Sequence, residues 1–240
     1  MFQAVGFDLG ETLIEYEGVA LDWQGEYPRA LAAVASSWGD SLAPAQIEAG
    51  MAVLRRYNTR LAPRRHEVDC ALLFAELLVA LDVRTQDVSA LLDPAIDAFF
   101  SVFQRRARPY LDAASSLATL ASADVPVGVL TDVPYAMPRR LVVADLSAAG
   151  LVELEPLLLT SVEVGRRKPD PAGFVALAEC IGCSPAAMLF VGNEEKDILG
   201  AKAAGMTAAL VWRSEAPIPA WGQDLSVTEL EQLPPTVVGR

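Results

Sequence analysis

Short apolar runs alternate with longer amphipathic segments at the start of the chain and again after residue 109. The apolar runs have the length of buried strands, and the segments between them carry hydrophobic residues at helical spacing. We predict strands at residues 4–8, 125–131, 157–160, 188–191 and 207–212. Strands that alternate with helices in this way predict a three-layer α/β fold with a parallel sheet.

Residues 26–108 show a different pattern, in which hydrophobic residues recur at helical spacing and no segment alternates like a strand. Proline at a first helical position and aspartate or threonine just before a helix mark where such segments begin. The second of them carries its apolar stripe as far as Leu61. We predict five helices, which begin near Tyr27, Pro44, Asp69, Thr85 and Asp93.

The helical stretch divides the chain into two predicted domains. An all-helical domain at residues 15–108 is inserted after the first strand, and residues 1–14 and 109–240 form the α/β core. Residues 11–25 read as an irregular segment with scattered glycines and acids. The tail after Arg213 contains four prolines, and we assign it weak structure and no chemistry.

Composition and charge exclude several classes of function. The chain has 240 residues, of which 52% are hydrophobic and 21% charged, as in a globular protein. Its net charge of -12 argues against binding to nucleic acid or to an anionic membrane. No uncharged apolar run approaches the roughly 20 residues that span a bilayer. We therefore expect a small-molecule partner, with no nucleic acid and no membrane, and a monomer or homodimer.

Cysteine and histidine are too sparse for several kinds of site. Cys70, Cys180 and Cys183 form an odd set without a secretory signal, which favours a reducing cytoplasm. Cys180 and Cys183 are spaced as CxxC, but the one histidine, His66, is far away in sequence. A helix end with its following turn explains this spacing better than zinc or redox chemistry. We expect His66 to face solvent.

Polar residues stand where the predicted strands end. Because open α/β sheets bind ligands outside the carboxyl ends of their strands, these residues are expected to meet there. A carboxylate in that position can act as a nucleophile or a metal ligand, although Asp8 by itself is explained equally well as a loop cap. The residues are Asp8, Thr131, Lys168 before Pro169, and the acidic loop Gly192-Asn193-Glu194-Glu195-Lys196-Asp197.

An aspartate at one strand end, a threonine at another, a lysine before a proline and an acidic loop, in this order, resemble the haloacid dehalogenase superfamily. The resemblance covers about residues 4–212 and, with the helical insertion, is to the helical-cap subgroup. It implies a Rossmann-like core and a helical cap that closes over the sheet and shapes the substrate pocket.

The resemblance also implies roles for individual residues. Asp8 would attack phosphorus and form an aspartyl-phosphate, which water then hydrolyses. Thr131 would bind a phosphoryl oxygen through its hydroxyl, Lys168 would supply positive charge, and the backbone amides of Leu9 and Gly10 would bind further phosphoryl oxygens.

The segment after the second strand is expected to border the pocket. Asp132 and Tyr135 are candidate substrate contacts there, yet a turn built around Pro134 explains them nearly as well.

The first motif departs from the usual phosphatase pattern, in which a second aspartate protonates the leaving group. Gly10 occupies that position and has no proton to give, so general acid–base help worth about 10²- to 10⁴-fold is missing from its usual place. Glu11 is the nearest candidate substitute. It stands one residue further on, where its side chain can point elsewhere.

Magnesium is the cofactor that the resemblance implies, because a carboxylate that attacks a phosphate needs its charge neutralised. Asp8 and the Gly10 carbonyl would bind it, with further ligands from the acidic loop at Asn193, Glu194 and Asp197. Asn193 stands where relatives usually carry aspartate. It offers a neutral oxygen and less charge.

Three functions are compatible with these residues. The one we favour is a magnesium-dependent phosphatase of a small phosphorylated metabolite that works through Asp8 and prefers aryl or acyl phosphates, which need no proton. A 2-haloacid dehalogenase is an alternative, but it usually has an aromatic residue at the position of Gly10. The third is a catalytically impaired protein that binds phosphorylated metabolites.

Overall fold

A computed structural model describes residues 2–233, and its central feature is a six-stranded parallel sheet. The order β5-β4-β1-β6-β7-β8 places the first strand in the interior of the sheet, beside β4 and β6. The strands are β1 (Ala4–Phe7), β4 (Val127–Thr131), β5 (Leu158–Thr160), β6 (Met188–Gly192), β7 (Thr207–Val211) and β8 (Leu225–Val227). The predicted parallel α/β sheet is confirmed.

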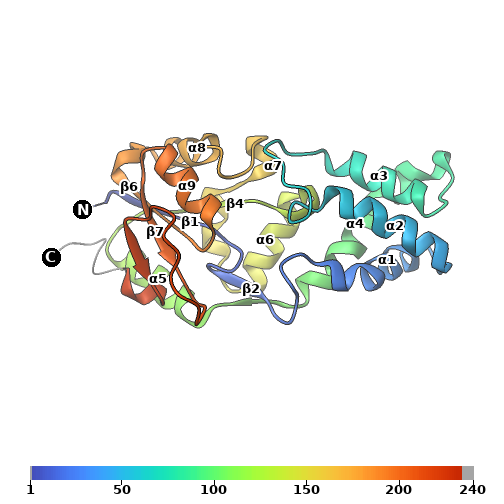
Figure 1. Cartoon of the computed structure of the whole chain (residues 1–240), viewed down its shortest axis with the longest axis horizontal. Coiled ribbons are helices and arrows are strands. Elements are labelled where there is room, and N and C mark those ends of the chain that lie inside the picture. The colour runs from blue at the N-terminus through green and yellow to red at the C-terminus, as the bar shows by residue number, and fades with distance from the viewer. Residues whose placement is uncertain (1, 234–240) are drawn as a thin grey trace.

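Helices cover both faces of the sheet and complete three layers (Figure 1). Side chains of β1 alternate, so that Val5 and Phe7 pack with α5 and α6, whereas Ala4 packs with α8 and α9. These helices are α5 (Leu111–Ser122), α6 (Arg139–Ala148), α8 (Ala172–Ile181) and α9 (Glu195–Ala203). Shorter elements of the core are α7 (Ser161–Val164), η2 (Pro134–Ala136), η3 (Val152–Leu157), η4 (Pro185–Ala187) and η5 (Leu230–Gln232).

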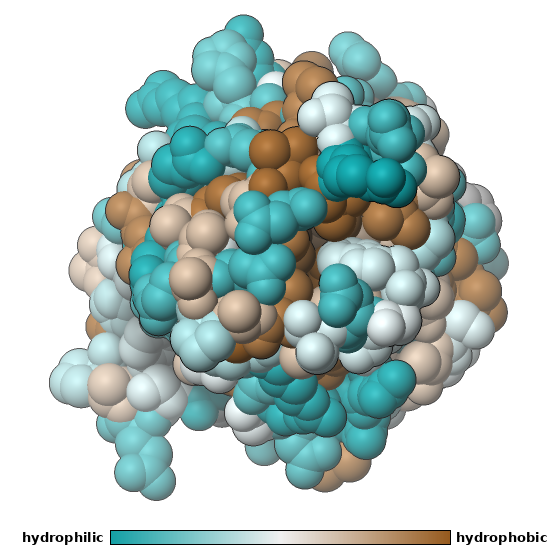
Figure 2. All heavy atoms as spheres, turned by 90° about the vertical axis from the view of Figure 1, so that its right-hand side faces the viewer, coloured by the Kyte–Doolittle hydropathy of each residue, from teal (hydrophilic) through white to brown (hydrophobic). Residues whose placement is uncertain are grey.

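Four helices between β1 and α5 form a second lobe, which we call the cap and which extends away from the sheet in Figure 1. They are α1 (Tyr27–Ser36), α2 (Pro44–Tyr57), α3 (Cys70–Ala80) and α4 (Thr85–Gln104), with η1 (Gln24–Glu26) before them. Seen from its free end in Figure 2, this lobe shows hydrophobic side chains among a rim of hydrophilic ones.

Two details of the cap differ from the sequence prediction. The fourth and fifth predicted helices are one helix, α4, with Pro94 inside it. A single buried stripe that includes Val88, Ile96 and Phe103 runs through α4, and its burial outweighs the roughly 3 kcal/mol cost of an interior proline. Helix α2 ends at Tyr57, so Leu61 lies beyond it and is largely exposed.

Three short strands were missed. β2 (Ile14–Tyr16) pairs antiparallel with β3 (Ala107–Pro109), where the chain enters and leaves the cap. The tail is also structured, because β8 extends the sheet and Arg213 binds Asp112 at 2.9 and 3.0 Å. Residues 11–25 are otherwise irregular, as expected, apart from the start of η1, and the described part of the tail is irregular outside β8 and η5. Strands of three residues carry too little periodicity to be recognised.

Within residues 2–233, none of the helices combines the length and apolar character that a bilayer span would need.

Candidate active site

Asp8 lies directly after β1, at the carboxyl end of the sheet, and its carboxylate is buried against Lys168. The Lys168 Nζ donates to Asp8 Oδ1 at 2.6 Å and to Asp197 Oδ1 at 2.8 Å. The side chains of Asp8, Lys168 and Asp197 are 8%, 2% and 0% exposed. Asp8 follows β1, Lys168 lies in the loop between α7 and α8, and Asp197 is in the first turn of α9, so the fold brings together residues from three separate motifs.

Burial and the neighbouring charges together shift the pKa values of Asp8 and Lys168. Burial raises the pKa of Asp8 to about 7, although Lys168 acts in the opposite direction. Burial lowers the pKa of Lys168, but the carboxylates of Asp197 and Asp8 outweigh it, so the net pKa lies above the ordinary value. Lys168 is therefore a fixed positive charge beside Asp8.

Asp197 is held in place by the start of α9. Its Oδ2 accepts from the backbone N–H groups of Asn193 at 3.2 Å and Glu194 at 3.0 Å. A Cβ atom at Gly192 would lie 2.4 Å from the Cβ of Asp197, so only glycine allows this approach. Both oxygens of Asp197 thus accept hydrogen bonds from the protein, and its role as a metal ligand stays a prediction.

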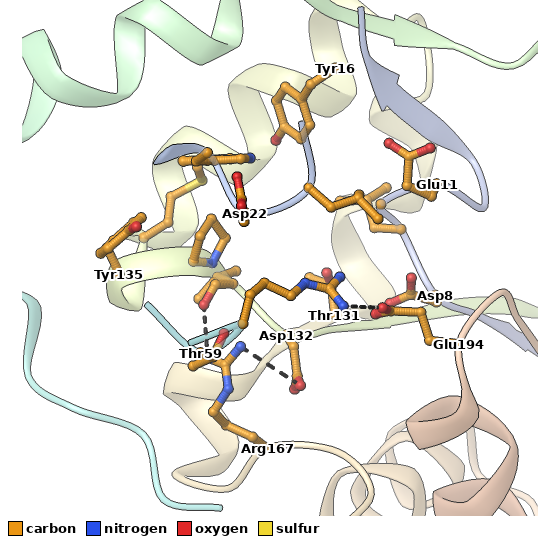
Figure 3. Close-up of a pocket in the computed structure, with 18 of the residues that line it drawn as sticks. Asp8, Glu11, Tyr16, Asp22, Thr59, Thr131, Asp132, Tyr135, Arg167 and Glu194 are labelled. Carbon is orange, nitrogen blue, oxygen red and sulfur yellow. Dashed lines mark hydrogen bonds and ion pairs between the residues drawn. The ribbon is translucent and has the colours of Figure 1, made fainter. Parts of the chain in front are cut away.

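A cavity of about 130 Å³ opens above Asp8 between the core and the cap (Figure 3). Most of the predicted site residues line it, whereas Lys168 and Asp197 lie behind Asp8. The predicted residues that line it are Asp8, Leu9, Gly10, Glu11, Thr131, Asp132, Tyr135, Asn193 and Glu194.

Thr131 and Asp132 reach the cavity from the end of β4. Thr131 is its last residue, and its side chain is buried at the cavity wall. The Asp132 Oδ1 accepts from the backbone N–H of Lys168 at 3.1 Å, and its Oδ2 lies 3.8 Å from Arg167 and 3.7 Å from Lys196. Asp132 therefore positions the loop that carries Lys168, and its predicted contact with substrate remains untested.

Tyr135 follows in η2, where its backbone adopts a left-handed conformation with φ 51°. Its hydroxyl lies 2.6 Å from that of Tyr27 in the cap, so the predicted substrate contact also joins the cap to the core.

Glu11, the candidate substitute for the missing acid, points away from Asp8 in Figure 3. Its backbone is left-handed with φ 59°, and its Oε2 accepts from the Tyr110 hydroxyl at 2.8 Å. Burial raises the pKa of Glu11, while the bond from Tyr110 lowers it. Glu11 does line the cavity, and its catalytic role stays a prediction.

The oxygen atoms at this end of the cavity suit magnesium in kind. Asp8 and Glu194 offer carboxylates, Gly10 a backbone carbonyl and Asn193 an amide oxygen, and Mg²⁺ prefers oxygen ligands. The Asn193 Oδ1 accepts from the Thr12 hydroxyl at 3.2 Å, which orients the amide. Over the described residues, histidine, cysteine, aspartate and glutamate form no cluster of three or more suited to a metal ion. A cation would therefore depend on the carbonyl and amide oxygens as well.

Arg60, on the cap loop after α2, is a site residue that the sequence did not reveal. Its Nη1 and the Lys196 Nζ both contact the Glu194 carboxylate. Burial raises the pKa of Glu194, but the charges of Lys196 and Arg60 outweigh it and lower the pKa to about 2. Nothing in the sequence distinguishes Arg60 from the other arginines of this region.

A further contact between the cap and the core joins the cap loop 64–67 to the core loop that precedes Lys168. Arg167 and Glu67 form an ion pair with side chains 4% and 3% exposed. Two backbone hydrogen bonds accompany it, from Arg167 N to Arg65 O at 2.9 Å and from Glu67 N to Gly165 O at 3.2 Å. We call these contacts the cap–core bridge. Glu67 stands in a charged stretch that reads as solvated surface.

The remaining expectations about individual residues concern the surface. His66 and Arg166 are both exposed, and Arg166 Nη1 lies 3.0 Å from His66 Nε2. Cys180 lies in α8 and Cys183 just after it, at the predicted helix end.

Comparison with known proteins identifies relatives along most of the chain. A family model described as haloacid dehalogenase-like hydrolase matches residues 2–205. A phosphoglycolate phosphatase of Yersinia pseudotuberculosis is 27% identical over 210 residues, which cover 85% of this chain and 78% of that protein. A phosphatase of Mycobacterium tuberculosis is 36% identical over 108 residues, and this match spans 45% of the chain and 48% of the relative.

Solved structures share the whole architecture at low identity. A HAD phosphatase from Thermococcus onnurineus superposes with a TM-score of 0.66 at 21% identity, covering 99% of this chain and 98% of that one. A 2-haloacid dehalogenase from Pseudomonas syringae pv. Tomato gives 0.68 at 22% identity, covering 100% and 99%. At these identities the likeness shows the fold alone.

Proposed function

The chain belongs to the haloacid dehalogenase-like hydrolases, and from this premise we propose that it hydrolyses a phosphate monoester through attack by Asp8. The observation that carries the proposal is the buried contact of 2.6 Å between Asp8 and Lys168 at the base of a cavity that Thr131 also lines. The names of the relatives from Yersinia and Mycobacterium, both phosphatases, support the same reaction class.

In the proposed first step a carboxylate oxygen of Asp8 forms a bond to phosphorus as the ester P–O bond breaks. The leaving group departs as an alkoxide or aryloxide and takes its proton from solvent unless a nearby acid supplies it. Water then cleaves the aspartyl-phosphate, which releases inorganic phosphate and restores the Asp8 carboxylate. No group is oxidised or reduced.

The surrounding residues lower the cost of bringing two negative groups together. The Lys168 ammonium offsets the charge of Asp8, and the Thr131 hydroxyl with the amides of Leu9 and Gly10 would hold the phosphoryl oxygens. Mg²⁺, when bound through Asp8, Gly10, Asn193 and Glu194, would neutralise further charge on the phosphoryl group. Since Gly10 carries no acid, leaving groups that are stable as anions should react fastest.

The test is hydrolysis of p-nitrophenyl phosphate by the full chain with and without magnesium, for wild type, Asp8→Asn and the surface control Asp87→Asn. We expect metal-dependent turnover in wild type and the control, and its loss in Asp8→Asn. If wild type is as silent as Asp8→Asn while inorganic phosphate still binds, the proposal fails and the protein is a phosphate-binding module. Chloride release from 2-chloropropionate would instead identify a dehalogenase.

A further inference from the structure

Building on the proposed function, we infer that the phosphate ester cleaved at Asp8 is that of a small uncharged apolar alcohol or phenol, and not of an acid such as glycolate. The inference rests on the part of the cavity that lies across from Asp8, on the charges around it and on its size.

Part of the cavity lining is apolar, and Trp23 contacts the rings of Tyr16 and Tyr135 there. We define this apolar compartment by Ile14, Tyr16, Trp23, Tyr135, Met137 and Val142. Figure 3 shows Tyr16 and Tyr135 across the cavity from Asp8 and Glu194. The leaving group of a phosphate ester attacked by Asp8 must project away from the carboxylate, because attack and departure are in line. The compartment is therefore where the leaving group would reside.

Trp23 gives the compartment a rigid aromatic wall. Its ring stacks on Phe103 with centroids 3.7 Å apart and planes inclined by 14°. The Tyr16 ring meets the same indole edge-on at 5.7 Å. Trp23 is only 6% exposed, so an apolar group that enters contacts a surface already fixed by packing.

The charges at the cavity disfavour an acidic leaving group. The cationic residues that line it, within the described chain, are Arg60, Arg167 and Lys196, and each already contacts a carboxylate. Asp22 lies on the same side as the compartment in Figure 3, and its carboxylate accepts two hydrogen bonds from Gln24. A carboxylate on the leaving group would meet this like charge, and each cation that lines the cavity already has a carboxylate partner.

Size sets a further limit. Tyr135 and Asn58 line the cavity and are held by Tyr27, whose hydroxyl lies 2.6 Å from that of Tyr135 and accepts from Asn58 Nδ2 at 2.6 Å. The cavity volume of about 130 Å³ is close to that of an engineered apolar cavity of about 150 Å³ that takes up benzene. Because the same cavity also has to hold the phosphoryl group, its volume favours a leaving group of one ring or a short alkyl chain.

The first experiment uses inert analogues, so that it does not depend on turnover. Binding of 2-phenylethylphosphonate and 3-phosphonopropionate to the wild-type chain with magnesium is measured by calorimetry. The two differ in carrying a phenyl ring or a carboxylate at the same position. We expect the phenyl compound to bind at least about tenfold more tightly, since differences of this order follow from a matched apolar pocket. Equal binding, or tighter binding of the carboxylate, overturns the inference.

The compartment itself is tested with Val142→Phe, which fills it from α6, and with Trp23→Phe, which retains an aromatic wall. Val142→Phe should reduce binding of the phenyl compound about tenfold or more while inorganic phosphate binds as before, and Trp23→Phe should have a smaller effect. Unfolding midpoints verify that both variants fold. Unchanged binding of the phenyl compound by folded Val142→Phe contradicts the inference.

Turnover separates this inference from the proposed function. Benzyl phosphate and phosphoglycolate are both esters of primary alcohols, so neither has the advantage of an aryl leaving group. Asp8-dependent hydrolysis that favours phosphoglycolate would overturn the apolar leaving group and leave the phosphatase standing. Tight binding of the phenyl compound with no Asp8-dependent turnover of any ester would overturn the phosphatase activity and leave the apolar compartment as a binding site.

Discussion

The ammonium of Lys168 lies 2.6 Å from the Asp8 carboxylate, and both residues are only 6% exposed. Lys168 is also the cation that Asp197 contacts, so it compensates two buried carboxylates. Such an arrangement links the proposed chemistry to the stability of the folded chain, because removal of one charge leaves the others unpaired.

Replacement of Lys168 by methionine is expected to abolish turnover of p-nitrophenyl phosphate and to lower the free energy of unfolding by about 3–5 kcal/mol. Urea denaturation measures the second effect. Lys202→Met is the matched control, because Lys202 contacts Asp224 at a surface where both side chains are about 40% exposed. That pair should contribute at most about 1 kcal/mol. Equal losses of stability in Lys168→Met and Lys202→Met would show that Lys168 contributes no more than a surface ion pair.

Gly10→Asp should restore the missing general acid. A Cβ atom at Gly10 would have no heavy atom within 4 Å, so the backbone and its surroundings accept a side chain. We expect turnover of alkyl phosphates to rise by up to about 10²-fold and that of p-nitrophenyl phosphate to change little. Gly10→Asn has the same shape and no acidic proton. A similar gain in Gly10→Asn would refute the acid as the cause.

Glu11→Gln tests whether Glu11 already fills that role. If it does, alkyl phosphate turnover falls by about 10²-fold while aryl turnover is retained, because only the poorer leaving group needs a proton. Steady-state rates on the two substrate classes give the answer, with Glu17→Gln, which changes an exposed glutamate, as the control. Parallel losses on both substrates would assign Glu11 a structural role through Tyr110.

Asp145→Asn should alter how stability depends on pH. Asp145 is 1% exposed on α6, and burial raises its pKa to about 6 from 3.8, although a hydrogen bond from Tyr16 lowers it. The folded chain thus binds this proton more tightly than the unfolded chain. The resulting stabilisation is complete below about pH 4 and is lost as pH rises through about 6, at a cost on the order of 1–3 kcal/mol.

Asparagine accepts the bond from Tyr16 and never ionises, so this variant should lack that loss. Denaturation at a series of pH values, with the surface variant Asp97→Asn alongside, measures the difference between mutant and wild type. A difference that stays constant between about pH 4 and pH 6 would show that Asp145 titrates as it does in the unfolded chain.

The parallel sheet and the approach of Asp8, Thr131 and Lys168 follow from local features of the sequence. An apolar run indicates a strand. A polar residue that follows it lies at the carboxyl end of the parallel sheet, whichever position the strand takes within the sheet. Each of these sequence patterns spans fewer than about ten residues, so it can be recognised without knowing how the elements pack.

Contacts between the cap and the core cannot be predicted from a short local sequence pattern. Whether Arg60 reaches Glu194, or Glu67 reaches Arg167, depends on how the two lobes meet and not on the residues beside them. The same holds for Trp23, whose place in the cavity is set by its stacking on Phe103. Strands β2, β3 and β8 were missed because three residues show no reliable alternation. Helix α4 was predicted as two helices because its burial outweighs the effect of Pro94.

The cap–core bridge sets a condition on the speed of a catalytic cycle. The cap is attached to the core at one side through the β2–β3 pair and at the other through Glu67, Arg167 and two backbone hydrogen bonds. Exchange of a bound product for fresh substrate by swinging the cap on the β2–β3 side therefore requires the contacts of the cap–core bridge to break and re-form once per turnover. In this protein the rate at which Glu67 separates from Arg167 would then be an upper limit to turnover, however fast the chemistry at phosphorus.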